Sequence, residues 1–233
     1  MFNIKNTIEI FAGSILDVIY PPLCLCCENL LVGGDKHVCV SCWESLKRVE
    51  TDLPLFLQTR DKLLADGVVD DLVSLYVFEK EGGFQKIIHA VKYSGTSSLG
   101  IDLGRRLGQN LKTHKTIADT LVPIPLHKRK LRERGYNQSE FIARGLSDVT
   151  GIPVNANYVE RAKFTQTQTT LSMEERRMNM ERAFTCVSSE VEGKVIVLVD
   201  DVITTGATIT SCAHMLKERG ATRVIATSVA LAS

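Results

Sequence analysis

The sequence predicts an α/β protein in which helices flank a parallel β-sheet, with a small metal-binding module at the N-terminus. From residue 70 onward, short apolar segments of strand length alternate with amphipathic segments of helix length, a pattern typical of parallel sheets. Five of the seven cysteines lie between positions 24 and 42. The apolar segment 194–199 runs directly into two acids and a Thr/Gly loop, and ligands of such sheets bind outside the carboxyl ends of strands.

Composition limits the classes of protein that this chain can represent. Its 233 residues allow one large domain with a small additional one, and 44% hydrophobic residues can form a substantial core. The net charge is +1, so contacts with nucleic acid must come from local patches. No stretch is apolar for long enough to span a bilayer, so we expect no transmembrane segment.

Residues 1–20 are expected to form an amphipathic helix. Two acids interrupt the apolar run and no small-residue cleavage site follows, so a signal peptide is disfavoured. The segment also lacks the basic face of a membrane-surface helix, which favours packing on the protein itself. The apolar positions near helical spacing are Ile8, Phe11, Ile15 and Ile19.

Residues 21–48 are predicted to form a zinc ribbon. Two C-x-x-C pairs can aim four thiolates at one tetrahedral Zn²⁺, and without a secretory signal a metal is favoured over disulfides. Four protein ligands leave no open position for chemistry, so we expect a structural site. Cys26 can replace a neighbouring ligand or be a spectator, and His37 is a further alternative. The predicted ligands are Cys24, Cys27, Cys39 and Cys42.

A connection, residues 49–70, leads into the main domain, residues 71–233. Its predicted strands and helices follow from apolar periodicity and from Gly and Pro breakers, and the helix at 208–219 ends at Gly220, a good stop. We expect strands at 70–79, 120–125, 194–199 and 223–231, and helices at 84–93, 99–111, 137–150 and 208–219.

The segment after strand 194–199 suits a sugar phosphate. Backbone N–H groups in a loop and at a helix N-terminus can hold a phosphate, while Gly206 lets the backbone turn. Because the carboxylates of Asp200 and Asp201 would repel that phosphate, we expect them to accept hydrogen bonds from sugar hydroxyls or to hold a bridging cation. The expected phosphate loop is Val202, Ile203, Thr204, Thr205, Gly206, Ala207 and Thr208.

Residues 197–209 resemble the phosphoribosyl-pyrophosphate (PRPP) motif of the type I phosphoribosyltransferases: an apolar run, two acids, two variable positions and a Thr/Gly-rich loop. The resemblance implies a type I phosphoribosyltransferase-like sheet and a site for PRPP with Mg²⁺. It also implies that Asp200 and Asp201 would be the catalytic residues of an enzyme, with Asp201 the more catalytic of the two.

Two further polar segments are expected near this site. Residues 127–134 carry five basic side chains and one acid; we expect a basic loop able to neutralise pyrophosphate, although a solvated loop is the alternative. Residues 161–184 are rich in Thr and Gln and long enough for a lid, or for a surface loop followed by a helix at 172–182. The pyrophosphate or lid candidates are Lys128, Arg129, Arg132, Arg161 and Lys163.

The order of the motifs resembles the ComF family over nearly the whole chain, from about position 21. After the paired C-x-x-C come Lys92-Tyr-Ser-Gly95, Val122-Pro-Ile-Pro125, Arg134-Gly-Tyr-Asn-Gln138, the series Gln168, Arg176, Asn179 and Phe184, and the PRPP motif; Cys26 is a departure. The resemblance implies a zinc-ribbon protein that helps internalised single-stranded DNA through the inner membrane in natural transformation. It also implies a cytoplasmic location, with peripheral membrane contact as an alternative.

Three functions are therefore compatible with the sequence. The first is a ComF-like protein that binds PRPP and Mg²⁺ and acts on single-stranded DNA; an aromatic content of 6% argues against an extended base-stacking platform. The second is an active phosphoribosyltransferase of nucleotide or amine metabolism, whose acceptor no segment identifies. The third is a docking protein for a DNA-uptake helicase or a membrane channel.

Overall fold

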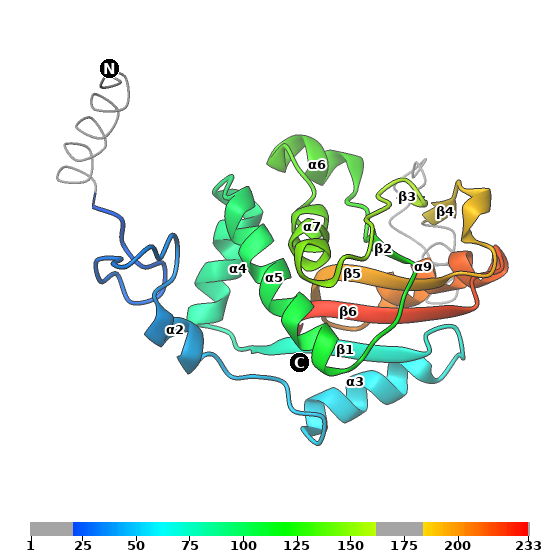
Figure 1. Cartoon of the computed structure of the whole chain (residues 1–233), viewed down its shortest axis with the longest axis horizontal. Coiled ribbons are helices and arrows are strands. Elements are labelled where there is room, and N and C mark those ends of the chain that lie inside the picture. Colours follow the sequence, from blue (N-terminus) through cyan, green and yellow to red (C-terminus); the bar gives the residue numbers. More distant parts are fainter. Residues whose placement is uncertain (1–20, 162–183, 233) are drawn as a thin grey trace, which may run out of the picture.

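The computed structural model describes residues 21–161 and 184–232, and within them a four-stranded parallel sheet forms the centre of the molecule (Figure 1). The sheet has the strand order β1-β6-β5-β2. Central strands β5 and β6 are mostly apolar and mostly buried, as expected for strands covered on both faces. The four strands are β1 (Asp71–Phe78), β2 (Thr120–Pro123), β5 (Val195–Ile203) and β6 (Arg223–Ala232).

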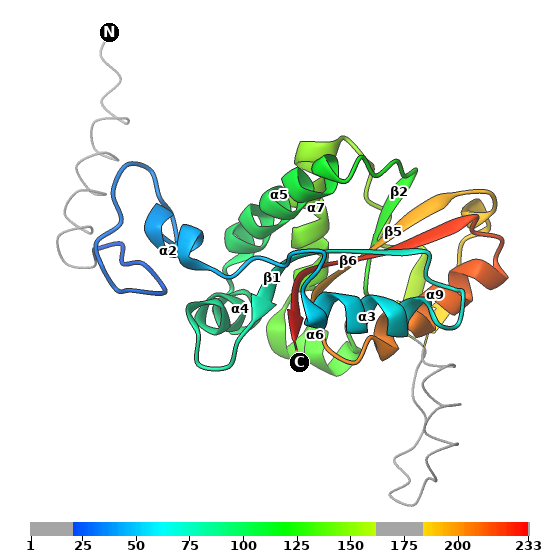
Figure 2. The ribbon, with the colours of Figure 1, turned by 90° about the horizontal axis from the view of Figure 1, so that it is seen from below.

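Helices cover both faces of this sheet (Figures 1 and 2). Helices α5 (Ser97–Thr113) and α7 (Gln138–Thr150) pack on one face, and α3 (Pro54–Leu64) and α9 (Ala207–Glu218) on the other. The remaining described elements are α2 (Val40–Ser45), α4 (Gly83–Tyr93), α6 (Lys128–Arg134), the 3₁₀ turn Ser189–Val191, and the antiparallel pair β3 (Val159–Arg161) and β4 (Phe184–Cys186).

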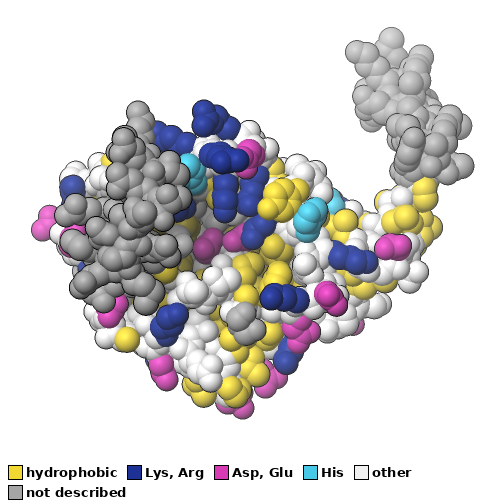
Figure 3. Space-filling view, turned by 180° about the vertical axis from the view of Figure 1, so that it is seen from behind, with side chains coloured by type: hydrophobic (Ala, Val, Ile, Leu, Met, Phe, Trp, Pro, Cys, Tyr) yellow, Lys and Arg dark blue, Asp and Glu magenta, His cyan; other side chains and the backbone are white. Residues whose placement is uncertain are grey.

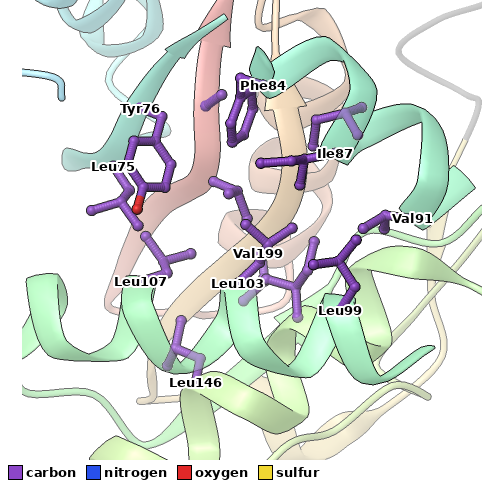
Figure 4. Packing of buried hydrophobic residues seen from close by; sticks show 14 of the residues in the cluster. Leu75, Tyr76, Phe84, Ile87, Val91, Leu99, Leu103, Leu107, Leu146 and Val199 are labelled. Carbon is purple, nitrogen blue, oxygen red and sulfur yellow. The ribbon is translucent and has the colours of Figure 1, made fainter. Parts of the chain in front are cut away.

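Each face of the sheet buries its own apolar layer. In one layer, Leu99, Leu103 and Leu107 of α5 meet Leu146 of α7 and Val199 of β5 (Figure 4). The three α5 leucines recur every four residues and are fully buried, so a single stripe of the helix faces the core. This layer fixes α5 and α7 over the strand that leads to the acid pair.

The crossing of α5 and α7 is unusually close because glycines line it. A Cβ atom on Gly104 would lie 2.0 Å from the carbonyl oxygen of Ile142, and one on Gly145 would lie 2.0 Å from that of Ile101. Only glycine fits at both positions, since real Cβ atoms do not approach backbone within 3.0 Å. The two backbones therefore touch directly, and α7 is held near β5.

The predicted fold class is confirmed, and two local expectations need correction. The basic segment expected as a loop is the helix α6, because His127 Nδ1 caps it by accepting from the N–H of Arg129 at 3.2 Å and Gly135 ends it with φ +79°. The motif strand is longer than expected, so Asp200 and Asp201 lie within β5 rather than beyond it.

Some predictions fall outside the described residues. The amphipathic helix expected at 1–20, Lys163 and the helix expected at 172–182 are among them. Within the described residues, none of the helices has both the length and the apolar character that a membrane span requires.

Candidate functional site

Asp200 sits in β5 beneath the first turn of α7. Its Oδ1 atom accepts hydrogen bonds from Ser139 Oγ at 3.2 Å and from the backbone N–H of Asp201 at 2.8 Å. Burial, and then the charge of the neighbouring Asp201, raises the pKa of Asp200 to about 8. A cation or a hydrogen-bond donor that enters this site would lower the pKa of Asp200 again, because either one stabilises the ionised carboxylate.

Asp201 is more deeply buried than Asp200 and forms an ion pair with a lysine of α4. Lys92 Nζ, from the last turn of α4, lies 2.9 Å from Asp201 Oδ2, and the carboxylate side chain is only 7% exposed. Gln138 Nε2 donates to the same oxygen at 3.4 Å, and the N–H of Val202 donates to Oδ1 at 2.8 Å. The carboxylate is therefore an ordered acceptor.

Sequence reasoning did not assign Lys92, Gln138 or Ser139 to the site. Lys92 and Gln138 do occur in two segments that carry the ComF resemblance, but nothing in those segments indicates that they meet at β5. The crossing of α5 and α7 and the position of α4 bring them together. The motifs therefore contained these residues, but only the fold shows that they contact the acid pair.

A further set of contacts fixes these partners. Arg134 Nη1 donates to Gln138 Oε1 at 2.9 Å, and its guanidinium carbon lies 5.1 Å from the centre of the Tyr93 ring. Asn137 caps α7 by accepting from the N–H of Ser139 at 3.2 Å, and its Nδ2 donates to the carbonyl of Ile124 at 3.0 Å. The start of α7 is thus tied to the end of β2.

The expected phosphate loop lines a small pocket together with Asp200. Gly206 adopts φ +78° and immediately precedes α9. The first helical hydrogen bond runs from the N–H of Thr210 to the carbonyl of Gly206, at 2.9 Å. The N–H groups of Thr208 and Ile209 therefore precede any intrahelical partner and suit an anion. The lining residues after Asp200 are Val202, Ile203, Thr204, Thr205, Gly206, Ala207, Thr208 and Ile209.

The predicted pyrophosphate contacts are only partly brought together. Lys128, Arg129 and Arg132 are exposed on α6, and Arg129 Nε is already paired with Glu133 at 2.8 Å. Arg161 ends β3 with its guanidinium 5.2 Å from the ring centre of Phe184, and its buried Nε has no hydrogen-bond partner within the described part of the chain. On the face seen in Figure 3, Lys and Arg side chains gather beside acidic ones.

The N-terminal cysteines form a cluster that fits zinc. The sulfur atoms of Cys24, Cys27, Cys39 and Cys42 all lie within 4.8 Å of one another, and those of Cys27 and Cys39 are 3.8 Å apart. Four thiolates at about 2.3 Å from one tetrahedral zinc stand about 3.8 Å apart. The predicted ligand set therefore has the right chemistry and spacing for structural zinc.

The two alternative ligands lie outside this cluster. Cys26 Sγ instead donates to the carbonyl of Gly83 at 3.5 Å, and burial raises its pKa to about 11. His37 Nε2 pairs with Ser98 Oγ at 2.8 Å. Cys26 is thus part of the contact between the ribbon and α4.

Comparison with known families places these features in a class. Residues 134–232 match the family model "Phosphoribosyl transferase domain", and residues 15–53 match "Double zinc ribbon domain". With the parallel sheet and the four-cysteine cluster, they define a type I phosphoribosyltransferase-fold protein with an N-terminal zinc ribbon.

Individual relatives narrow that class. The chain is 38% identical over 112 residues to Competence protein F of Haemophilus influenzae, covering 47% of this chain and 49% of the relative. It is 32% identical over 143 residues to DNA utilization protein YhgH of Salmonella typhimurium (59% and 63%) and 26% identical over 241 residues to Competence protein ComFC of Bacillus subtilis (87% and 91%). The first two matches span about half and under two thirds of those relatives. The resemblance to the ComF family is confirmed, and the chain is a ComF-like protein.

Proposed function

We propose that this protein binds PRPP with Mg²⁺ at the end of β5, and that this site serves DNA uptake in natural transformation. The observation that carries the first part is the juxtaposition of a buried acid pair with an open helix N-terminus. Asp200 borders the same pocket as residues 202–209. A ligand that joins a phosphate to vicinal hydroxyls matches that pair of features.

The ligand would lie along β5 in a defined order. Its 5′-phosphate would be held by the loop 204–208 and the N–H groups of α9, and its ribose hydroxyls would donate to Asp200 and Asp201. These carboxylates are hard oxygen ligands that also suit Mg²⁺, which would neutralise the charge of the pyrophosphate. Lys92 would hold the Asp201 carboxylate in place as an acceptor through their 2.9 Å ion pair.

The exposed basic side chains of α6, together with Arg161 at the end of β3, favour turnover as a second function. In that reaction an acceptor nitrogen forms a bond to C1 of PRPP. The bond from C1 to the pyrophosphate oxygen breaks, its electron pair leaves with pyrophosphate, and the acceptor nitrogen loses a proton. Positioning and charge stabilisation would drive this step. Lys128, Arg129, Arg132 and Arg161 are the described candidates for stabilising the departing pyrophosphate.

The names of the relatives support the cellular part of the proposal. Competence proteins and a DNA utilization protein are among them, and α6 offers exposed basic side chains to phosphates. A cytoplasmic site of action next to an uptake helicase or membrane channel remains a prediction from the family resemblance.

Titration calorimetry with PRPP and Mg²⁺ tests the site. The double substitution Asp200→Ala with Asp201→Ala should abolish binding, whereas Asp66→Ala, at an exposed acid near the end of α3, should leave it intact. Undiminished binding in the double variant would contradict the proposal.

A separate titration tests the DNA contact. Binding of a fluorescent single strand of DNA should weaken as salt rises. The logarithm of the association constant should fall against the logarithm of the salt concentration with a slope of about 0.7 per phosphate contacted. Removing two contacts with Lys128→Ala and Arg132→Ala should lower that slope by about 1.4. An unchanged slope would exclude α6 as the DNA-binding element.

A further inference from the structure

The first hairpin of the zinc ribbon, residues 22–32, exposes one apolar face. Leu23 and Leu30 form an antiparallel bridge across it, so their side chains project from the same face. They are 48% and 54% exposed, whereas the residues that follow each of them, Cys24 and Leu31, are buried. Val32, two positions beyond Leu30, is 68% exposed and continues this face. The hairpin therefore buries one side and presents three large apolar side chains on the other.

This apolar face leads to a groove on α4. Leu25, two positions after Leu23, lines a groove of about 430 Å³ together with residues of that helix. Lys86 Nζ donates to the carbonyl oxygen of Cys26 at 3.0 Å, so the ribbon and α4 form two walls that are held together. Leu25 and Ala90 are apolar parts of the lining, and the alkyl stem of a lysine can also contact an apolar group. The exposed face of the hairpin and this groove together form the hairpin–α4 surface.

The chain itself supplies an apolar segment at this point. Residues 1–20 precede Pro21, with which the described part of the chain begins, and Pro21 lies two positions before Leu23. The four residues from Pro21 to Leu25 span at most about 14 Å, and a helix of 20 residues is about 30 Å long. Such a helix can fold back over the hairpin and reach the groove. Because a short tether gives an effective concentration in the millimolar range, this segment has an advantage over a second copy or a separate partner.

The sequence of that segment is amphipathic in the way this surface requires. In a helix, Ile8, Phe11, Ile15 and Ile19 would lie within about 80° of the circumference and span about 16 Å. Asp17 would lie on the opposite side and face away from a surface that these four residues contact. An isolated helix of this length is marginal in water, so packing of its apolar stripe is what would stabilise it.

We propose that residues 1–20 form an amphipathic helix that folds back onto the hairpin–α4 surface, with Ile15 and Ile19 over Leu23 and Leu30 and with Phe11 toward the groove. The stripe of the helix and the face of the hairpin then remove each other from water, which is favourable for both. The hairpin–α4 surface is thus a docking site for a segment of the same chain. This inference goes beyond the PRPP site and does not depend on it, because none of its residues belongs to the acid pair or to the loop 202–208.

Photocrosslinking of the whole, zinc-loaded chain tests this placement. Phe11 is replaced by p-benzoylphenylalanine, a photoreactive residue that keeps an aromatic ring at this position, and the crosslinked monomer is mapped by mass spectrometry. Crosslinks within one chain to residues 22–32 or 82–94 are expected. The same replacement at Asn6, on the polar side of the helix, is the matched control and should not give them.

Substitutions in the hairpin test its part in the contact. Leu23→Asp with Leu30→Asp should lower the crosslink yield by about tenfold, the effect of losing about 1.4 kcal/mol of docking free energy. Ile117→Asp, at an exposed side chain in the loop before β2, should leave the yield unchanged. A zinc content equal to that of the natural protein verifies that the ribbon of each variant is folded.

The crosslink map decides the question without any change in the ribbon. Crosslinks that join two chains would overturn the proposal and assign the hairpin–α4 surface to a second copy. Crosslinks that fall elsewhere in the chain, or a yield that survives Leu23→Asp with Leu30→Asp in a zinc-loaded protein, would overturn it as well.

Discussion

Replacing Gly104 with alanine should destabilise the protein, against the intrinsic preference of the helix. The new Cβ would lie 2.0 Å from the carbonyl oxygen of Ile142, 2.8 Å from its carbonyl carbon and 2.9 Å from the nitrogen of Leu146. All three are backbone atoms, so no side chain can rotate away. To reach even 3.0 Å, the lower limit of real Cβ contacts, α5 and α7 must separate by about 1 Å.

The net effect follows from two opposing terms. In an exposed helix, Gly→Ala stabilises by about 0.8–1 kcal/mol. Overpacking that shifts backbones costs about 1–3 kcal/mol, and this site belongs at the upper end because Leu103, Leu107 and Leu146 beside it are fully buried. We therefore expect a net loss of about 2 kcal/mol in the free energy of unfolding.

Urea unfolding of the zinc-loaded protein, followed by circular dichroism, measures this loss. Gly100→Ala is the matched control on the same helix, because its Cβ would meet Phe141 Cβ at 3.0 Å and the nearest backbone atom only at 3.9 Å, so a shift of a few tenths of an ångström accommodates it. That variant should stay within about 1 kcal/mol of the natural protein. If Gly104→Ala proves as stable as the natural protein, the close crossing does not exist as described.

Three further predictions concern the site itself. Since burial and the charge of Asp201 raise the pKa of Asp200 from 3.8 to about 8, the folded protein binds more protons than the unfolded chain between these pH values. The free energy of unfolding should therefore fall as pH rises through this window. Denaturation curves at pH 5 and 8.5 should show a smaller loss of stability in Asp200→Asn than in the natural protein, and an equal loss in the two proteins would count against the burial argument. Lys92→Met should lower the free energy of unfolding by about 2 kcal/mol. This is less than the 3–5 kcal/mol lost when a fully buried pair is broken, because Lys92 is 24% exposed. If Lys92→Met melts at the same temperature as Lys92→Arg, which keeps the charge, the ion pair does not stabilise the fold. Gly206→Ala should cost about 1–2 kcal/mol and weaken ribose 5-phosphate binding, since φ is +78° and the Cβ would meet Leu63 Cδ2 at 2.6 Å; unchanged calorimetric affinity would show that the loop adapts.

Local sequence signals predicted the strands and most helices because the core is regular. Segments of mostly apolar residues indicated β5 and β6, and leucines at helical spacing indicated α5. The error at residues 127–134 came from giving charge more weight than propensity. Lys, Arg, Leu and Glu are all good helix formers, and Gly135 stood in the position of a helix stop.

The partners of the acids could not be predicted in the same way. Lys92 lies on α4 and Gln138 on α7, and no periodicity relates either residue to Asp201. The glycines at 100, 104 and 108 share one face of α5, but a stripe of small residues predicts a close approach only when the partner is known. Gly145 on α7 completes that surface, and the crossing then brings Gln138 and Ser139 to the acids.

Helix α4 gives a physical route between the zinc ribbon and the acid pair. The ribbon binds the start of α4, where Cys26 Sγ donates to Gly83 and Lys86 Nζ donates to the carbonyl of Cys26 at 3.0 Å. Lys92 binds Asp201 at the other end, and an 11-residue helix spans about 16 Å.

This route predicts that zinc and PRPP bind cooperatively. Removing zinc with a chelator should free the start of α4 and lower PRPP affinity, by about threefold to tenfold if the coupling is near 1 kcal/mol. Thermodynamic linkage then requires PRPP to raise zinc affinity by the same factor, which competition with a chromogenic chelator can measure. Lys86→Ala, which breaks the contact without touching a zinc ligand, should reduce both effects together. Unchanged PRPP affinity after zinc removal would rule out this coupling, and an effect of zinc that Lys86→Ala leaves at full size would show that the coupling does not run through the start of α4.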